Sequence, residues 1–215
     1  MNENIAEIYS ILKKEVKKYP LPFAESVHEK YKDPFFILVA TILSARTLDT
    51  TTAKVCEKLF KEVKGINDLE KISLEKLEKL LYPVGFYKTK AKHLKELPIV
   101  LREKFNGKVP EEIEQLLELP GVGRKTANLV VSIAFEKQGI CVDTHVHRIT
   151  NLLGIVKTNT PLETEMELRK ILPKKLWIET NYIFVLLGQN VCLPRNPKCE
   201  ICGVRNYCSI GKNIK

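Results

Sequence analysis

Two amphipathic segments of this chain meet at the sequence LPGVGRKTAN, residues 119–128. Proline ends the segment before the turn, and the two glycines allow a backbone with positive φ and a close approach to another molecule. The amides of the turn and of the next helix start then point at one spot, which can hold a phosphate without reading sequence. The stretch predicts a helix, a hairpin turn and a second helix, with phosphate contacts at Gly121, Val122 and Gly123.

Lys125 falls in the first turn of the second helix, on the side opposite an apolar face formed by Ala127, Val130 and Val131. A lysine in such a position is usually a solvated surface residue. The positive end of the helix dipole, however, disfavours the ammonium form, and a neutral lysine amine is a nucleophile. Lys125 is therefore either a surface residue or the nucleophile of a covalent reaction.

Asp143 lies in a second short motif, VDTHVHRI, residues 142–149. Its structural interpretation is a helix N-cap, a position that aspartate favours. Helix amides around the side chain stabilise the carboxylate, which can accept a proton from an amine or stabilise a developing cation. The two interpretations are compatible with each other.

Four of the six cysteines fall within residues 192–208, with the spacing C-x6-C-x2-C-x5-C. They are Cys192, Cys199, Cys202 and Cys208. Four thiolates this close together can bind one tetrahedral metal ion or the four irons of a cubane cluster. Structural zinc usually uses two CxxC pairs and only one is present, so the iron–sulfur cluster is the favoured reading. The other two cysteines, Cys56 and Cys141, are expected to be small buried hydrophobes.

The chain is basic: 35 Lys and Arg against 26 Asp and Glu give a formal charge of +9. A basic protein often binds a polyanion, although a lysine-rich solvated surface is the alternative. The first ten residues carry acids where a signal peptide needs positive charge, and the longest apolar run, residues 35–43, is too short to span a bilayer. We expect a cytoplasmic protein without a targeting signal, in a compartment where disulfides are rare.

Helical periodicity dominates the sequence and predicts an all-α fold. The segments with this pattern are residues 5–16, 69–81, 90–105, 160–172 and 178–187. Residues 35–44 are apolar nearly all round, which is typical of a buried central helix. Pro110, followed by several acids, predicts a further helix start. The sequence TPLE, residues 160–163, has the pattern of a capping box and predicts the start of the helix that runs toward Leu172. Residues 139–142 give the only hint of extended chain and are too short to nucleate a sheet.

Three motifs together resemble endonuclease III of the helix–hairpin–helix glycosylase superfamily: LPGVGRKTAN, VDTHVHRI and the cysteine spacing. ILSARTLDT, residues 42–50, and GFYKTKA, residues 85–91, resemble two further segments of that family. The similarity runs in order from about residue 30 to residue 208. The joint set of motifs is much more specific than any one of them.

The resemblance implies two helical domains. Residues 27–137 would form a six-helix barrel with the helix–hairpin–helix element, and residues 1–26 and 138–215 would form a domain around a [4Fe–4S] cluster. The implied activity is that of a bifunctional DNA glycosylase and AP lyase in base excision repair. Such an enzyme removes oxidised or saturated pyrimidines from double-stranded DNA and nicks the abasic strand by β-elimination. The chain is expected to bind this DNA as a monomer at the nucleoid.

The resemblance also implies roles for single residues. Lys125 matches the nucleophile that attacks the sugar C1′ and forms a Schiff base, and Asp143 matches the carboxylate that assists it. Phe86 matches a side chain inserted into the duplex, the alternative being a core residue. His145 and Arg148 match a stretch where either residue could bind DNA or pack at a helix start. 

Lys90, in the segment that contains Phe86, is also expected to bind DNA.

Arg46 departs from the family pattern, which usually has Gln after Leu-Ser-Ala. The residue is expected to meet the base opposite the lesion, and a guanidinium favours an acceptor-rich partner such as guanine. A mismatch-specific thymine or uracil DNA glycosylase therefore stays an alternative, although such enzymes generally lack the lysine. Adenine glycosylases share the cysteine loop but lack the lysine and carry a further domain. A non-enzymatic, cluster-bearing protein that binds damaged DNA would need neither Lys125 nor Asp143.

Overall fold

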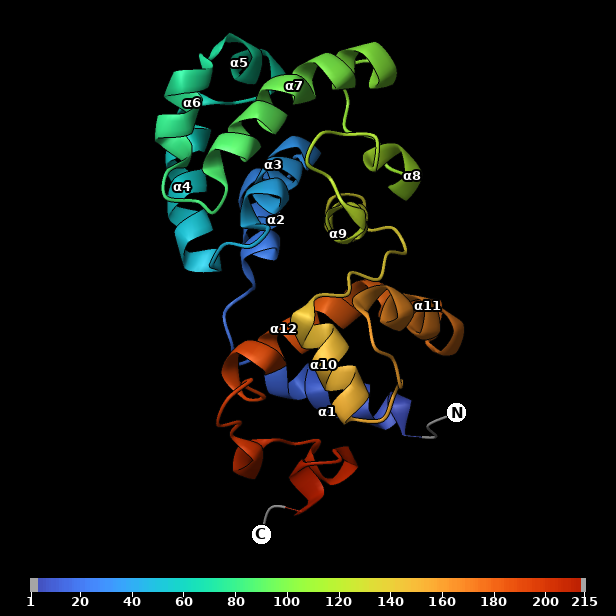
Figure 1. The fold of residues 1–215 in the computed structure, drawn as a ribbon. Helices are drawn as coiled ribbons and strands as arrows, with labels where there is room; N and C mark the ends of the chain where they lie inside the picture. The colour runs from blue at the N-terminus through green and yellow to red at the C-terminus, as the bar shows by residue number, and fades with distance from the viewer. Residues whose placement is uncertain (1–3, 214–215) are drawn as a thin grey trace. The chain divides into compact units, whose positions relative to one another are not determined.

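The computed structural model describes residues 4–213, which form helices and no strand (Figure 1). The predicted all-α class is confirmed. Residues 23–137 form one compact unit, here called the hairpin unit. The described residues before and after it form the other, here called the cysteine unit. No helix in residues 4–213 has the length and the apolar character that crossing a membrane requires.

The helices of the hairpin unit are α2 (Phe23–Tyr31), α3 (Pro34–Ser44), α4 (Asp49–Glu62), α5 (Ile66–Lys71), α6 (Leu74–Leu81), α7 (Tyr87–Phe105), α8 (Ile113–Leu116) and α9 (Arg124–Ala134). The central helix is α3, which contacts α2, α4, α7 and α9. Asp33 caps it by accepting the amide of Phe35 at 2.8 Å, and Pro34 supplies the fixed φ of the first turn. Residues 35–43 are all buried, as the apolar run predicted.

The amphipathic segment predicted over residues 69–81 is helical, but two helices cover it. Helix α5 ends at Lys71, and Ile72 and Ser73 are extended. The Ser73 hydroxyl then accepts the amide of Lys76 at 3.2 Å and caps α6. The amphipathic pattern continues across the break because α5 and α6 both bury leucines against α7.

The helix start predicted at Pro110 is also displaced, since α8 begins at Ile113. Of the acids that were expected in the first turn, Glu114 lies there, whereas Glu111 and Glu112 precede the helix and pair with a lysine. Lys137 Nζ lies 3.1 Å from a carboxylate oxygen of Glu111 and 2.6 Å from one of Glu112. These two ion pairs accompany an extended backbone at Glu112, and the helix forms only after it.

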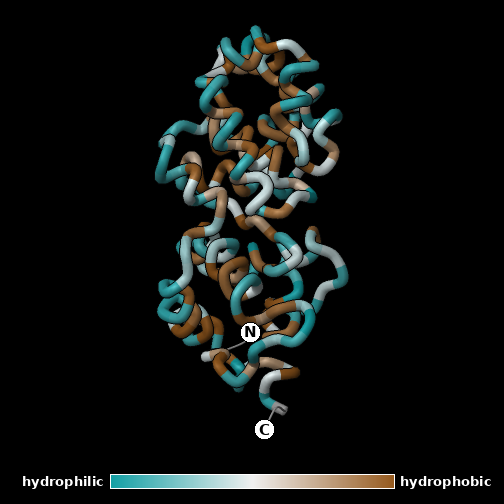
Figure 2. The backbone as a smooth tube through the Cα atoms, turned by 90° about the vertical axis from the view of Figure 1, so that its left-hand side faces the viewer, coloured by the Kyte–Doolittle hydropathy of each residue, from teal (hydrophilic) through white to brown (hydrophobic). Residues whose placement is uncertain are grey.

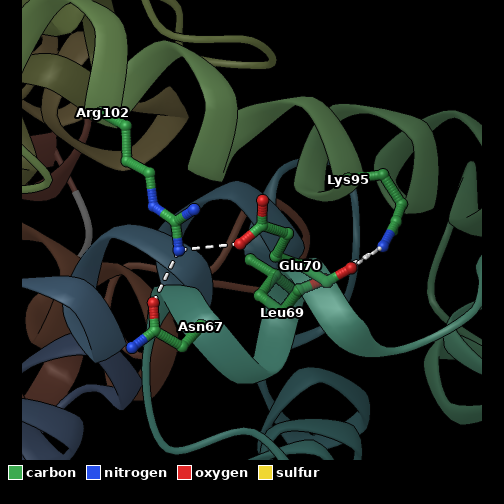
Figure 3. Close-up of polar contacts among 5 residues, drawn as sticks. All are labelled: Asn67, Leu69, Glu70, Lys95 and Arg102. Atoms are coloured by element: carbon green, nitrogen blue, oxygen red, sulfur yellow. Dashed lines mark hydrogen bonds and ion pairs between the residues drawn. The ribbon is translucent and has the colours of Figure 1, made fainter.

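Polar contacts fix α5 against α7 (Figure 3). Arg102 of α7 donates to the Asn67 side chain at 2.6 Å and pairs with the Glu70 carboxylate at 2.7 Å. Lys95, two turns earlier in α7, donates to the backbone carbonyls of Glu70 and Ile72, each at 2.6 Å. It also reaches the carbonyl of Leu69 at 3.3 Å. The end of α5 is therefore held by side chains of one neighbouring helix.

The helices of the cysteine unit are α1 (Ile5–Val16), α10 (Thr144–Leu152), α11 (Pro161–Ile171), α12 (Trp177–Asn190) and the short 3-10 turns η1 (Lys174–Leu176), η2 (Cys199–Ile201), η3 (Arg205–Tyr207) and η4 (Gly211–Asn213). The helix predicted over residues 5–16 is confirmed, and its apolar positions at helical spacing, Ile5, Ile8, Leu12 and Val16, are buried. Helix α12 packs against α1 and α10. Tyr9 marks the first of these contacts, since its hydroxyl lies 2.8 Å from that of Thr180 and its ring meets Phe184 edge-on.

The predicted capping box at the start of α11 is confirmed. The Thr160 hydroxyl accepts the amide of Glu163 at 3.2 Å. The Glu163 carboxylate is hydrogen-bonded to the backbone of Thr160 and accepts the amide of Asn159 at 2.9 Å. The hydrogen bond from Asn159 is the main reason why the pKa of Glu163 lies below its ordinary value. Along the helices of both units hydrophobic and hydrophilic residues alternate, as Figure 2 shows.

Candidate functional site

The predicted hairpin joins α8 to α9, and its turn depends on one glycine. Gly121 has φ +76°, a conformation that side chains rarely adopt. A Cβ atom there would lie 2.7 Å from the ring nitrogen Nδ1 of His93. Gly123 differs, because its φ of −100° suits any residue and a Cβ would meet nothing within 4 Å. The conformational need for glycine is confirmed at 121 and absent at 123.

Helix α9 begins with no side-chain cap at Gly123. The amide of Ala127 bonds to the Gly123 carbonyl at 2.9 Å, so the intrahelical ladder starts only there. Amides earlier in the first turn have no acceptor within their helix, and together with the helix dipole they form a site that suits an anion. The start of α9 therefore has the properties expected of a phosphate contact.

Val122 does not share in that property. Its side chain is 8% exposed and belongs to the core of the hairpin unit. Its amide donates to the Leu119 carbonyl at 3.1 Å, which closes the turn. The expected phosphate contact at Val122 is thus corrected: this residue anchors the turn from inside.

Lys125 is exposed in the first turn of α9. The opposite face of the helix is buried, with Ala127 and Val130 in the core and 0% exposed. The backbone of α9 is therefore held firmly by packing while the amine of Lys125 extends into solvent. This arrangement gives a fixed position to an amine that a molecule from solution can reach.

Asp143 is the N-cap of α10, as the structural interpretation predicted. Its Oδ1 atom accepts the amides of His145 and Val146, both at 2.9 Å. Within the described residues its Oδ2 atom accepts no hydrogen bond, and the side chain is half-buried. One oxygen therefore holds the helix, and the other keeps its capacity to accept a proton.

His145 and Arg148 follow on the same helix, and both make contacts inside the cysteine unit. The His145 side chain lies against Gly188 of α12. A Cβ atom on Gly188 would come within 2.9 Å of the Nδ1, Cγ and Cβ atoms of His145. Arg148 donates from Nη2 to the backbone carbonyl of Cys192. Of the two interpretations left open for this pair, packing is the one that these contacts favour.

Arg46 and Phe86, the two predicted contacts to the duplex interior, lie together. The guanidinium carbon of Arg46 is 5.7 Å from the centre of the Phe86 ring, within the range of a cation–π contact. Phe86 is 63% exposed, so the alternative of a core residue is wrong. Both residues have positive φ, 54° and 58°, which a residue other than glycine seldom adopts.

The turns that carry these two residues are in direct contact. The amide of Gly85 donates to the hydroxyl of Thr47 at 3.1 Å. A Cβ atom on Gly85 would lie 2.8 Å from the carbonyl oxygen of Arg46. Only glycine at position 85 lets the two backbones approach this closely.

Lys90 is not placed to bind DNA, which corrects the expectation from the sequence. The residue is 6% exposed, and its ammonium donates to the carbonyls of Leu43 and Ala45 at 2.8 and 2.6 Å. It also donates to the Thr47 hydroxyl at 3.2 Å. Burial lowers the pKa of Lys90 from 10.5 to about 8. A sequence signal for burial exists, since Lys90 precedes the core residue Leu94 by four positions and so shares its helix face.

The four clustered cysteines are unpaired thiols, each partly buried in the cysteine unit. Burial raises the pKa of Cys202 to about 11, and the negative charges of Glu15, Cys192 and Cys199 add to the effect. Burial likewise raises the pKa of Cys192, and Cys208 and Cys199 add to the effect. Four thiolates that repel one another in a partly apolar setting become favourable when they ligate positive iron, because ligands bind deprotonated. The cysteine set fits an iron–sulfur cluster.

Among residues 4–213, no three His, Cys, Asp or Glu side chains are grouped as ligands of one metal ion. In a [4Fe–4S] cluster each of four cysteines binds a different iron, so the four do not converge on one ion. The two remaining cysteines, Cys56 and Cys141, are 2% and 1% exposed, which confirms them as buried residues.

Comparison with known proteins gives two family matches. Residues 39–174 match the HhH-GPD superfamily of base excision DNA repair proteins, and residues 192–208 match the iron–sulfur binding domain of endonuclease III. Endonuclease III of Thermotoga maritima is 46% identical over 90% of this chain and 88% of its own length. Endonuclease III of Bacillus subtilis is 36% identical over 97% of this chain and 94% of its own.

Solved structures agree with these matches. A non-covalent endonuclease III–DNA complex aligns with a TM-score of 0.87 at 36% identity, over 99% of this chain and 98% of the other. A trapped covalent endonuclease III–DNA intermediate aligns with a TM-score of 0.85 at 38% identity, over 96% of both chains. A thermostable thymine-DNA glycosylase aligns with a TM-score of 0.81 at 27% identity, over 97% and 96% of the chains.

Proposed function

Because this chain belongs to the endonuclease III family of base excision repair proteins, we propose that its exposed Lys125 is the nucleophile of the family's reaction. The chain is a bifunctional DNA glycosylase and AP lyase that binds damaged double-stranded DNA, and it carries a [4Fe–4S] cluster. The observation that supports Lys125 most is its place at the uncapped start of α9, where an amine and a phosphate site adjoin. Its substrates are oxidised or saturated pyrimidines and abasic sites.

The chemistry that follows is a substitution and then an elimination. The neutral amine of Lys125 attacks C1′, and the damaged base leaves with the electrons of the glycosidic bond and takes up a proton. The amine loses its protons and the sugar ring opens, which gives an imine. Removal of a C2′ proton then expels the 3′ phosphate and nicks the strand, and water hydrolyses the imine to return Lys125.

Asp143 supports this reaction through its carboxylate. Oδ1 is occupied by the helix amides, so Oδ2 is the oxygen that can accept a proton during the reaction. A carboxylate also stabilises the positive charge that develops on the sugar as the base departs. The cap thus keeps a charged acceptor at a fixed place on α10.

Arg46 faces the base opposite the lesion and favours guanine there. Its planar guanidinium carries five donors and no acceptor, which matches the O6 and N7 acceptors of guanine. The family usually has Gln at this position, so the opposite-base preference of this chain differs from the family's. The similarity to a thymine-DNA glycosylase keeps a mismatch activity as the second candidate.

The cysteine unit holds the cluster. Its ligands are Cys192, Cys199, Cys202 and Cys208, and the cluster stabilises the loop that they form, because binding only to the folded chain adds folding free energy. We assign the hairpin unit to the barrel domain and the cysteine unit to the cluster domain; the compactness of each unit supports this assignment. The enzyme works as a monomer in the cytoplasm, at the nucleoid, where its substrate lies.

Trapping with borohydride tests the nucleophile. The protein is mixed with duplexes that hold an abasic site, thymine glycol or a G·T mismatch, and borohydride reduces any imine to a stable protein–DNA adduct. The wild type should give an adduct and a nick with the first two substrates. Lys125→Gln should give neither, yet bind the abasic duplex as tightly as wild type does, since the helix amides are unchanged.

Two outcomes would contradict the assignment. An adduct that persists in Lys125→Gln would move the nucleophile to another amine. Base release by the wild type without any adduct would make water the nucleophile. Base release without an adduct from the G·T duplex, and from no other duplex, would favour the mismatch activity.

A further inference from the structure

We propose that Lys90 is a positioning residue that joins the turns carrying Arg46 and Phe86, so that both side chains meet the DNA as one unit. The inference rests on the proposed function, in which these two side chains contact the duplex. Lys90 itself is buried and does not touch DNA. Its effect on the reaction passes through the two turns that it holds together.

The ammonium of Lys90 binds one turn while its backbone belongs to the other. Its three acceptors, the carbonyls of Leu43 and Ala45 and the hydroxyl of Thr47, surround the turn in which Arg46 lies. Its own amide donates to the carbonyl of Phe86 at 3.0 Å, in the first turn of α7. Lys90 is therefore bonded to both turns at once.

Thr47 completes the connection from the other side. Its hydroxyl accepts both from Lys90 and from the amide of Gly85, the residue before Phe86. The end of α3, the turn after it and the start of α7 thus share one small hydrogen-bond network. A network of this kind is cooperative, so loss of one member weakens the others.

The network holds a backbone that would otherwise relax. Arg46 and Phe86 both have φ in the left-handed region, which costs roughly 1–2 kcal/mol for a residue other than glycine. Such conformations persist only where the surroundings over-determine them, and they cluster at functional sites. The contact between the guanidinium and the ring depends on both conformations, since it joins the two exposed side chains at 5.7 Å.

Burial of the charged Lys90 ammonium costs free energy, and filling the space in the core does not require a charge there. Within the described residues no carboxylate pairs with its ammonium, so the charge is compensated by neutral acceptors only. A methionine would fill a similar volume without that cost. What methionine lacks is three donors on one atom, which is what joining these three acceptors requires.

Helix α7 offers a matched control in Lys95. Its ammonium also has three acceptors, which here are the backbone carbonyls of residues 69, 70 and 72 at the end of α5. Figure 3 shows Lys95 beside the first two of these residues. Lys95→Met removes the same kind of bonds from the same helix and leaves the turns of Arg46 and Phe86 unaltered. Lys90→Met and Lys95→Met are therefore compared in a double-mutant cycle with the pair Arg46→Ala and Phe86→Ala.

The measurement is the single-turnover rate of base release from a thymine glycol duplex, and from a single strand that holds the same lesion. Arg46→Ala with Phe86→Ala should slow the duplex reaction and spare the single strand, because only a duplex has to be opened. Lys90→Met should slow the duplex reaction on the order of tenfold to a hundredfold, the loss that small misplacements cause. In the doubly substituted background the same change should cost less than about twofold, because the side chains that it positions are gone.

Lys95→Met should change the rate by the same factor in both backgrounds. Thr47→Val is the milder second variant: it removes the shared hydroxyl from a half-buried residue and should reproduce the duplex effect in part even where Lys90→Met folds poorly. Equal losses from Lys90→Met in both backgrounds, or on duplex and single strand alike, would overturn the inference. An unchanged duplex rate after Arg46→Ala and Phe86→Ala would instead overturn the proposed roles of these two residues in DNA binding. That variant keeps Lys90, so its result is independent of the test of Lys90.

Discussion

Substitution of Gly121 by alanine is the most direct test of the hairpin, because two separate penalties can be worked out for it. Alanine at φ +76° costs roughly 1–2 kcal/mol through the clash of its Cβ with its own backbone. The same Cβ would lie 2.7 Å from His93 Nδ1 and 3.2 Å from His93 Cβ, so rotation of the imidazole alone does not remove the contact. With a typical overpacking cost of about 1 kcal/mol, the total comes to roughly 2–3 kcal/mol.

Gly123→Ala is the matched control two residues away. Its φ is negative and its Cβ would meet no atom within 4 Å, so neither penalty applies. Its remaining cost is that of alanine in an N-cap position, about 1 kcal/mol or less. The added variant Gly121→Ala with His93→Ala removes the steric penalty and keeps the conformational one.

The assay is thermal unfolding followed by circular dichroism, together with affinity for an abasic-site duplex. Gly121→Ala should lower the midpoint by roughly 4–10 °C and weaken DNA binding, since the turn that orients α9 is strained. Gly123→Ala should lower it clearly less, and the added His93→Ala should recover part of the loss. Equal midpoints for the two glycine variants would refute the argument from φ and contact distance.

Three further results are expected. Asp143→Asn should slow base release on the order of ten- to ten-thousand-fold at nearly unchanged stability, whereas Asp143→Ala should also lose roughly 1 kcal/mol of stability with the cap; equal stabilities in denaturant would contradict the cap. The wild type should gain stability over Lys90→Met as the pH rises from about 8 to 10.5, because in this range the folded wild type releases the Lys90 proton while the unfolded chain keeps it. The difference between their free energies of unfolding is measured by urea titration at each pH. A difference that stays flat or falls would show that the Lys90 ammonium stays charged. Cys202→Ala should lower the iron content below about four per chain and reduce the visible absorbance; a full complement of iron would remove Cys202 from the ligand set.

Local chemistry explains which parts of the fold were predicted from the sequence. The buried run of α3, the cap at Asp143 and the capping box of α11 each depend on residues within one or two turns. The turn at Gly121 is equally local, because only glycine adopts its φ without strain. Such features can be predicted because the residues that cause them are neighbours in the chain.

The features that were missed depend on partners distant in sequence. Lys90 is more than 40 residues from each of its three acceptors, and no local pattern shows that α3 ends beside it. The positive φ of Arg46 and of Phe86 likewise follows from the contact of two turns. Helix α4 was not singled out either, since its first turn of Asp and three Thr has low helix propensity and its stability comes from packing.

The Asp143 carboxylate caps α10 and is proposed to take part in proton transfer, and the two roles together restrict the choice of residue at this position more than either role alone. Asparagine, serine and threonine cap a helix but carry no negative charge, and glutamate carries the charge on a longer side chain that caps poorly. Aspartate alone meets both needs. Asparagine also caps a helix, so Asp143→Asn should keep the fold and the DNA affinity while it removes the proposed proton acceptor. This variant would therefore allow a complex with an uncleaved lesion to be isolated.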